Sequence, residues 1–323
     1  MKLLTRLGWL LALLLLGVAI SIATLRAGLW NPSYAMVKSK YATPPSQFLD
    51  VGGVSVHLRD EGHGPALVML HSSQTNLRIW DDWVDVLKAN YRVIRVDWPP
   101  YGLTVDNSGQ YSMANAASLL ERIVDQLRLA KFTLIGSSSG ATICVLYAAR
   151  HPERVDALAL STLPLAAPPP SRTDPRVTAI GWLHKKFFPN YFPRIYYRWL
   201  LPGLFADPMR VTPEIVSWYY ESNNTPGTQE RIASYLQADV QTIWKTTGHN
   251  DAEKVTAPVL LQWGDADPVL PAALGDNARD HLRNAKVKLI HYADAGHYPM
   301  LEIPQRTVKD LQQFLATIYP TTH

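Results

Sequence analysis

The 323-residue chain contains a single cysteine, Cys144, so it cannot form a disulfide within itself. It has no Cys/His cluster at metal-ligand spacing and no glycine-rich loop of the kind that cradles phosphate. These absences leave no indication of a metal ion or a nucleotide cofactor. Cys144 lies on the apolar face of a predicted helix, which favours a buried core position over a nucleophilic role.

Acidic residues are almost missing from residues 172–199, where Asp174 is the only one. Aromatic side chains gather there instead: Trp182, Phe187, Phe188, Tyr191, Phe192, Tyr196, Tyr197 and Trp199. Basic side chains are interleaved with them: Arg172, Arg176, Lys185, Lys186, Arg194 and Arg198. This composition predicts a helical lid that lines an apolar acyl pocket, rests on an anionic membrane surface, or does both. Packing of the aromatics on the core, with the cations solvated, is equally compatible.

The whole chain has a formal charge of only +4. It shows no motif of a nucleic-acid-binding fold, so we expect no nucleic-acid partner.

The most informative segment is the apolar run Phe132–Ile135, followed by Gly-Ser-Ser-Ser-Gly at residues 136–140 and a helical pattern over residues 141–149. This order predicts a strand, a sharp turn and a helix, with a serine at the apex of the turn. Glycine suits the two flanking positions because a side chain there would collide with the turn. Ser139 also has small residues two positions away on each side, but counting from the strand favours Ser138 as the apex.

A carboxylate and an imidazole follow in the chain order typical of one fold, Ser…Asp…His. A predicted strand at residues 257–263 leads to Asp265 and Asp267, and another at 286–291 leads to Asp294 and His297. A serine hydroxyl needs an imidazole to accept its proton, and the imidazole needs a carboxylate to fix its tautomer. Asp294 is only three residues from His297, so we expect it to be a solvated turn residue.

These motifs resemble the α/β-hydrolase fold family, and the resemblance covers residues from about 47 to 318 with a weaker middle. It includes His71-Ser72-Ser73-Gln74 after one predicted strand, residues 97–104 after the next, and the loop around His297. Ser72 and Pro100 stand where the family usually has glycine. Within the family, serine at the apex implies acyl transfer to water, whereas haloalkane dehalogenases and epoxide hydrolases carry aspartate there.

The resemblance also implies the roles of individual residues. Ser138 would be the nucleophile and His297 the general base, and Asp267 fits the family's Gly-X-X-Asp spacing from Gly264. The N–H groups of Ser73 and Ser139 would form the oxyanion hole, while His71 would position its loop.

Strand and helix patterns alternate along the chain and begin with a hairpin at residues 48–60, which predicts an α/β fold. We expect the α/β-hydrolase fold: a mostly parallel central sheet with helices on both faces and a helical cap after the sixth core strand. The predicted division is an N-terminal segment at 1–25, a tether at 26–46, core at 47–163, cap at 164–250, and core again at 251–323.

The N-terminal segment has a basic start, with Lys2 and Arg6, and an uncharged, overwhelmingly apolar stretch from Leu7 to Leu25. These 19 residues exceed the ~18 that span a bilayer and the ~7–15 of a signal-peptide core. An uncleaved, single-pass anchor is therefore favoured, with the catalytic domain extracytoplasmic, on the periplasmic side in a bacterium. Cleavage near Ser21-Ile22-Ala23 and secretion is the alternative.

We therefore expect a serine hydrolase that cleaves a carboxylic ester of an apolar acyl substrate through an acyl-enzyme. Lactone or carbon–carbon bond hydrolysis on the same triad is an open alternative. A binding protein that kept the fold but lost turnover is a further alternative of a different class. The sequence does not specify an oligomeric state.

Overall fold

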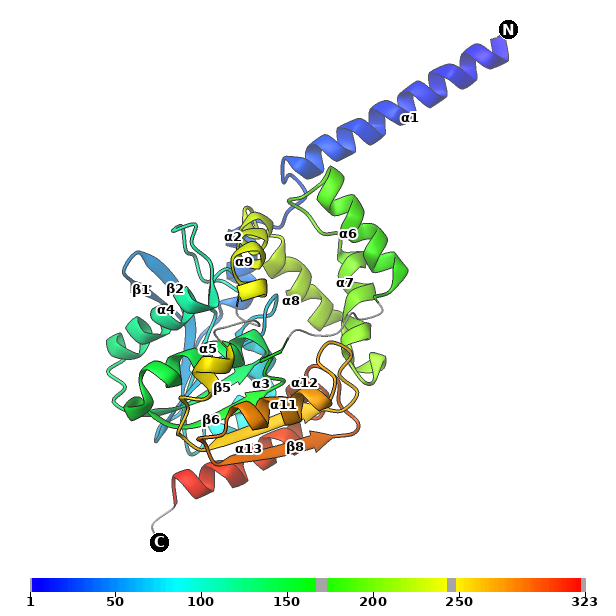
Figure 1. Ribbon diagram of the computed structural model, residues 1–323. Coiled ribbons are helices and arrows are strands. Elements are labelled where there is room, and N and C mark those ends of the chain that lie inside the picture. The colour runs from blue at the N-terminus through cyan, green and yellow to red at the C-terminus, as the bar shows by residue number, and fades with distance from the viewer. Residues whose placement is uncertain (1, 167–172, 243–247, 321–323) are drawn as a thin grey trace.

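The computed structural model describes residues 2–166, 173–242 and 248–320 and contains an eight-stranded sheet in the order β1-β2-β4-β3-β5-β6-β7-β8 (Figure 1). The strands are β1 Ser46–Val51, β2 Val54–Glu61, β3 Ala66–Leu70, β4 Arg92–Val96, β5 Phe132–Ser137, β6 Val155–Ser161, β7 Val259–Gly264 and β8 Val287–Tyr292. β2 pairs antiparallel with β1 and β4, and all other pairs are parallel. The predicted hairpin and mostly parallel sheet are confirmed.

Helices cover both faces of the sheet, because the central strands are apolar on both sides. Val68 and Leu134 pack into one cluster with residues of α4 and α5, whereas Leu67 and Ile135 pack into a second with residues of α3 and α13. The helices of the core are α3 Asp81–Leu87, α4 Met113–Gln126, α5 Ser139–Arg150, α11 Ala273–His281, α12 Pro299–Glu302 and α13 Pro304–Ile318. Short 3-10 turns are η1 Leu77–Trp80 and η2 Pro152–Arg154.

Helical segments also fill the interval between β6 and β7, where the cap was expected. They are α6 Pro175–Phe187, α7 Arg194–Leu200, η3 Leu201–Leu204, η4 Pro208–Arg210, α8 Pro213–Asn223, α9 Thr228–Thr242 and α10 Gly248–Ala252. Parts of the predicted cap, residues 167–172 and 243–247, lie outside the described residues. Tyr197 of α7 and Tyr219 of α8 belong to the second core cluster, so this part of the cap packs on the body.

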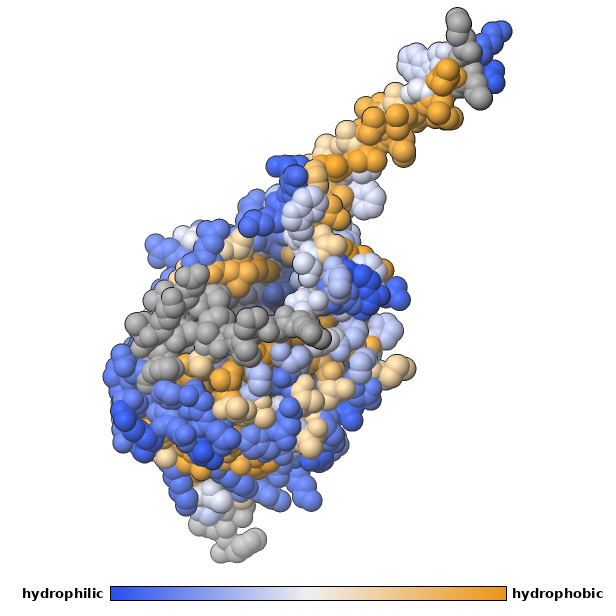
Figure 2. Space-filling view, turned by 45° about the vertical axis from the view of Figure 1, so that its right-hand side comes forward, coloured by the Kyte–Doolittle hydropathy of each residue, from blue (hydrophilic) through white to orange (hydrophobic). Residues whose placement is uncertain are grey.

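Helix α1, Lys2–Arg26, projects away from the body as a single straight stalk (Figure 1). Its stretch from Leu4 to Arg26 is 23 residues long, with a mean hydropathy of 2.3 and no residue of its most apolar window buried. Figure 2 shows an apolar band along this helix, with polar residues near its two ends. By length and composition alone, α1 could cross a membrane, and a signal sequence has the same properties.

The predicted tether at residues 26–46 is wrong as a description of this segment. It contains a helix, α2 Tyr34–Tyr41, whose Val37 and Tyr41 are buried in the second core cluster. Ser33 caps this helix by accepting the N–H of Met36 at 3.2 Å.

A buried carboxylate joins α2 to the helices after β6. Glu221 of α8 is 6% exposed and accepts hydrogen bonds from Lys40 Nζ at 2.8 Å and from the Tyr41 hydroxyl at 2.7 Å. Arg194 of α7 reaches the same carboxylate at 3.2 Å. The segment therefore clamps α7 and α8 rather than separating α1 from the body.

We expect Glu221→Gln to lower the free energy of unfolding by about 1–2 kcal/mol, because it removes the charge that three donors share. Chemical unfolding followed by tryptophan fluorescence measures the change. Glu214→Gln is the matched control, since Glu214 is 67% exposed where it pairs with Arg78, and a change within about 0.5 kcal/mol is expected. Equal effects of the two substitutions would contradict the clamp.

Candidate active site

Ser138 stands at a sharp turn between β5 and α5, as predicted from the sequence. Its backbone has φ 52° and ψ −121°, a strained conformation for a residue with a side chain. A Cβ added to Gly136 would lie 2.6 Å from the Cα of Ala141, and one added to Gly140 would collide with the carbonyl oxygens of Leu70 and His71. Glycine is therefore required on both sides, and the turn presents Ser138 at the carboxyl edge of the sheet.

His297 is paired with Asp267, the acid favoured by the sequence. The His297 Nδ1 lies 2.7 Å from Asp267 Oδ2, and both side chains are buried. The other carboxylate oxygen, Oδ1, accepts the N–H groups of Val269 at 2.8 Å and Leu270 at 2.9 Å. Because the carboxylate is fixed by two backbone donors, it can orient the imidazole and leave Nε2 available for proton transfer.

The two competing acids have other partners. Asp265 Oδ1 lies 2.6 Å from His291 Nδ1, and Asp294 forms an exposed ion pair with Arg306 at 2.6 Å. The expectation that Asp294 is a solvated turn residue is confirmed.

Two serine pairs connect the loop after β3 to the turn that carries Ser138. The Ser72 hydroxyl donates to Ser137 Oγ at 3.0 Å. The Ser73 N–H donates to Ser139 Oγ at 2.7 Å, and the two hydroxyls of that pair are also 2.7 Å apart. The N–H that was predicted to bind an oxyanion therefore already has an acceptor, and the Ser139 side chain must rotate before that N–H can serve a substrate.

His71 is fully buried, and its contacts are those of a loop-positioning residue, as expected. Its Nδ1 lies 2.8 Å from the Ser72 carbonyl oxygen, and its Nε2 accepts the Trp98 N–H at 3.3 Å. Burial lowers the pKa of His71 below its usual value, which favours the neutral ring.

Ser138 and His297 line one cavity of about 290 Å³. Its other lining residues are Ser72, Ser73, Gln74, Tyr196, Leu200, Leu204, Tyr219, Val269 and Tyr298. Burial raises the pKa of Tyr298 to about 12, so its hydroxyl stays protonated at neutral pH. Tyr196 belongs to the aromatic stretch identified in the sequence. Leu204 and Tyr219 were not predicted, because no local pattern indicates that they face the site.

The histidine loop is bonded directly to the segment that follows α7. The His297 N–H donates to the Leu204 carbonyl at 2.8 Å. The buried Glu302 carboxylate accepts the N–H groups of Gly296 and Ala206, each at 2.8 Å. Burial raises the pKa of Glu302 above its usual value, although the two N–H donors act in the opposite direction. The position of His297 is therefore tied to the position of the cap.

Residues 65–199 match the family model described as alpha/beta hydrolase fold. The chain is 27% identical over 264 residues to the pimeloyl-acyl-carrier-protein methyl ester esterase of Nitrosomonas europaea, which covers 79% of this chain and 97% of that protein. It is 25% identical over 272 residues to the 2-hydroxy-6-oxo-2,4-heptadienoate hydrolase of Pseudomonas putida, with 82% and 94% covered.

A solved structure of another protein is similar to this chain over almost its whole length. It is the crystal structure of a bacterial membrane phospholipase A, a virulence factor, with a TM-score of 0.68 and 25% identity. The match covers 97% of this chain and 99% of the other.

We expect Ser139→Ala to raise kcat/KM for a soluble ester by about two- to tenfold, since the Ser73 N–H would no longer have to give up a hydrogen bond. Steady-state kinetics with a p-nitrophenyl ester provides the measurement. Ser137→Ala is the control, because Ser137 contacts Ser72 and not the Ser73 N–H, and no rise is expected. A fall in the Ser139→Ala variant would mean that the hydroxyl is needed to hold the loop.

Proposed function

We propose that this chain, which has the α/β-hydrolase fold and whose residues 65–199 match the family of that fold, cleaves a carboxylic ester by a Ser-His-Asp triad. Ser138 is the nucleophile, His297 the general base and then acid, and Asp267 the orienting carboxylate. The observation that carries the proposal is the buried His297–Asp267 pair, whose imidazole lines the same cavity as Ser138. The strained backbone at Ser138 adds support.

The proposed reaction has two halves. Ser138 Oγ attacks the carbonyl carbon while His297 accepts the hydroxyl proton, and the N–H groups of Ser73 and Ser139 stabilise the oxyanion. The tetrahedral intermediate then collapses, and the alcohol leaves with the proton from His297. Water then attacks the acyl carbonyl carbon while His297 takes its proton. The second tetrahedral intermediate collapses, Ser138 Oγ leaves with the proton from His297, and the carboxylic acid product is released.

An apolar acyl group fits the lining of the cavity. Leu200, Leu204 and Val269 lie around it together with three tyrosines, and none of the described residues that line it is acidic. The names of two similar proteins, a methyl ester esterase and a phospholipase A, support an ester as the substrate. The similar heptadienoate hydrolase supports carbon–carbon bond cleavage as the second candidate, and a lactone would suit the same chemistry.

Membrane attachment by α1 is the second part of the proposal. A 23-residue apolar helix that leaves the body without burying its side chains supports an anchor over a packed core helix. Likeness to the membrane phospholipase over 97% of this chain, which includes most of α1, adds support. The two cations before the apolar stretch favour an extracytoplasmic body, and removal of α1 as a signal is the alternative.

A fluorophosphonate probe tests the nucleophile directly. We expect the full-length protein to be labelled and Ser138→Ala not to be, because only an activated serine reacts at a useful rate. Asp267→Asn should lower kcat by about 10⁴-fold through loss of the correct tautomer. Asp265→Asn, the matched control, should stay within about threefold of wild type, since Asp265 pairs with His291. Folded protein that the probe does not label would instead indicate a binding protein without turnover.

A series of p-nitrophenyl esters tests the apolar pocket. We expect kcat/KM to rise from acetate to medium-length chains, because each buried CH₂ contributes roughly 0.8 kcal/mol until the cavity is full. Leu204→Ser should flatten this dependence, while Leu29→Ser should preserve it, because Leu29 is exposed and is not among the residues that line the cavity. A preference for acetate in the wild-type protein would contradict an apolar acyl pocket.

A further inference from the structure

Helix α6 has 13 residues, and almost all of its side chains are exposed or only partly buried. Of its described residues, Val177 alone is buried. Trp182 is 57% exposed and Leu183 37% exposed, and Lys185 and Lys186 are exposed beside them. Helix α7, in contrast, contributes Tyr196 and Leu200 to the cavity, so the two neighbouring helices face different surroundings.

The C-terminal end of α6 is fixed to the foot of α1. Asn190, three residues after α6, donates from its amide Nδ2 to the Arg26 carbonyl at 3.1 Å. Asn190 also accepts a hydrogen bond, because the Asn31 Nδ2 donates to the Asn190 carbonyl at 3.0 Å. Figure 1 shows the same proximity, with one end of α6 beside the point where α1 leaves the body.

This attachment sets the depth of α6 if α1 spans a bilayer. The 19 residues from Leu7 to Leu25 measure about 28 Å at ~1.5 Å per residue, close to the ~30 Å of a hydrocarbon core. Arg26 then lies at the boundary of the headgroup region, and Asn190, which is bonded to it, lies at the same level. Lys186 is four residues from Asn190, within about one helical turn of that boundary.

The side chains at this level have the chemistry of a membrane interface. Tryptophan is enriched at the headgroup level, and lysine stems cover apolar surface while their charges reach phosphate. Lys186 Nζ lies 4.9 Å from the ring centre of Trp182, and α6 contains no acidic residue. Leu29 and Trp30, at the foot of α1, are also strongly exposed, at 73% and 57%.

We infer that the C-terminal half of α6, residues Trp182 to Lys186, lies on the surface of an anionic bilayer into which α1 is inserted. Trp182 and Leu183 enter the headgroup region, and Lys185 and Lys186 contact lipid phosphates. The inference rests on the proposed anchoring by α1. The partner of the exposed helix α6 would then be the same bilayer that surrounds the apolar side chains of α1.

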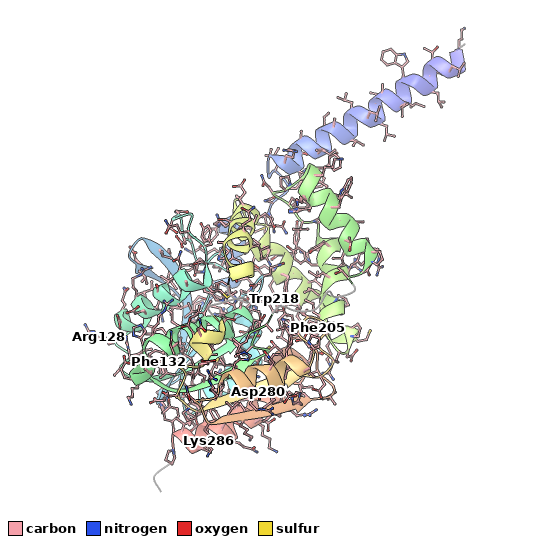
Figure 3. All side chains as sticks on the ribbon, in the orientation of Figure 1. Arg128, Phe132, Phe205, Trp218, Asp280 and Lys286 are labelled. Carbon is pink, nitrogen blue, oxygen red and sulfur yellow. The ribbon has the colours of Figure 1, made fainter. Side chains whose placement is uncertain are left out.

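The experiment uses a fluorescent label on the full-length chain in vesicles. Cys144 is buried, so a cysteine introduced by Trp182→Cys can be labelled selectively with an environment-sensitive dye. Asp280→Cys is the matched control, because Asp280 is exposed on α11, on the part of the body away from α1 (Figure 3). In vesicles with one-quarter phosphatidylglycerol, we expect headgroup-level nitroxide lipids to quench the label at 182 at least threefold more than the label at 280.

Charge reversal tests the role of the lysines. Lys185→Glu with Lys186→Glu should weaken binding of α6 to the vesicle surface about tenfold, which is measured as a loss of quenching at 182. Lys286→Glu with Lys288→Glu, where Lys286 directly precedes β8 and Lys288 lies within it, should leave the quenching at 182 unchanged. Hydrolysis of a soluble p-nitrophenyl ester should be the same in all variants, which excludes misfolding.

The possible failures are distinguishable. If the protein stays in the membrane pellet after an alkaline carbonate wash but the label at 182 is quenched no more than that at 280, the inference is overturned and the anchor stands. If the wash releases the protein, the anchor and the inference both fail. In either case, labelling of Ser138 by the fluorophosphonate probe still reports separately on the proposed chemistry.

Discussion

The close approach of the first turn of α5 to the loop after β3 is the constraint on which the site depends. A Cβ added to Gly140 would collide with the carbonyl oxygens of Leu70 and His71, so the two loops approach too closely to admit a side chain there. The Ser138 turn, the Ser72–Ser137 bond and the Ser73–Ser139 bond are all located at this contact. A residue larger than glycine at position 140 would separate the nucleophile from the donors proposed to stabilise its product.

Regular elements and their order could be predicted from the sequence, because parallel strands buried on both faces are short apolar runs. The Ser138 turn was predictable for a related reason, since a steric requirement for glycine leaves a local pattern. Asp267 was favoured over Asp265 by spacing alone, and the structure adds the physical reason, which is that each carboxylate has a different histidine. The catalytic roles of these residues remain predictions.

Contacts between distant segments could not be predicted in this way. The tether expected at residues 26–46 became a clamp because Lys40 and Tyr41 meet Glu221, about 180 residues later. Ser72, where relatives usually have glycine, has a partner in Ser137 that only the fold reveals. The aromatic stretch was ambiguous for the same reason: α7 turns toward the cavity, whereas α6 turns away from the body.

The hydrogen bonds that join Asn190 to Asn31 and to the Arg26 carbonyl have a consequence for how such a protein would encounter its substrate. If α1 is inserted in a bilayer as proposed, a body held at the foot of this helix would not tumble independently, and its cavity would keep a nearly constant height and tilt above the lipid. Encounters would then occur by lateral diffusion in two dimensions, and the relevant substrate concentration would be a surface density. The histidine loop, bonded to the cap through Leu204 and Ala206, would share that fixed orientation.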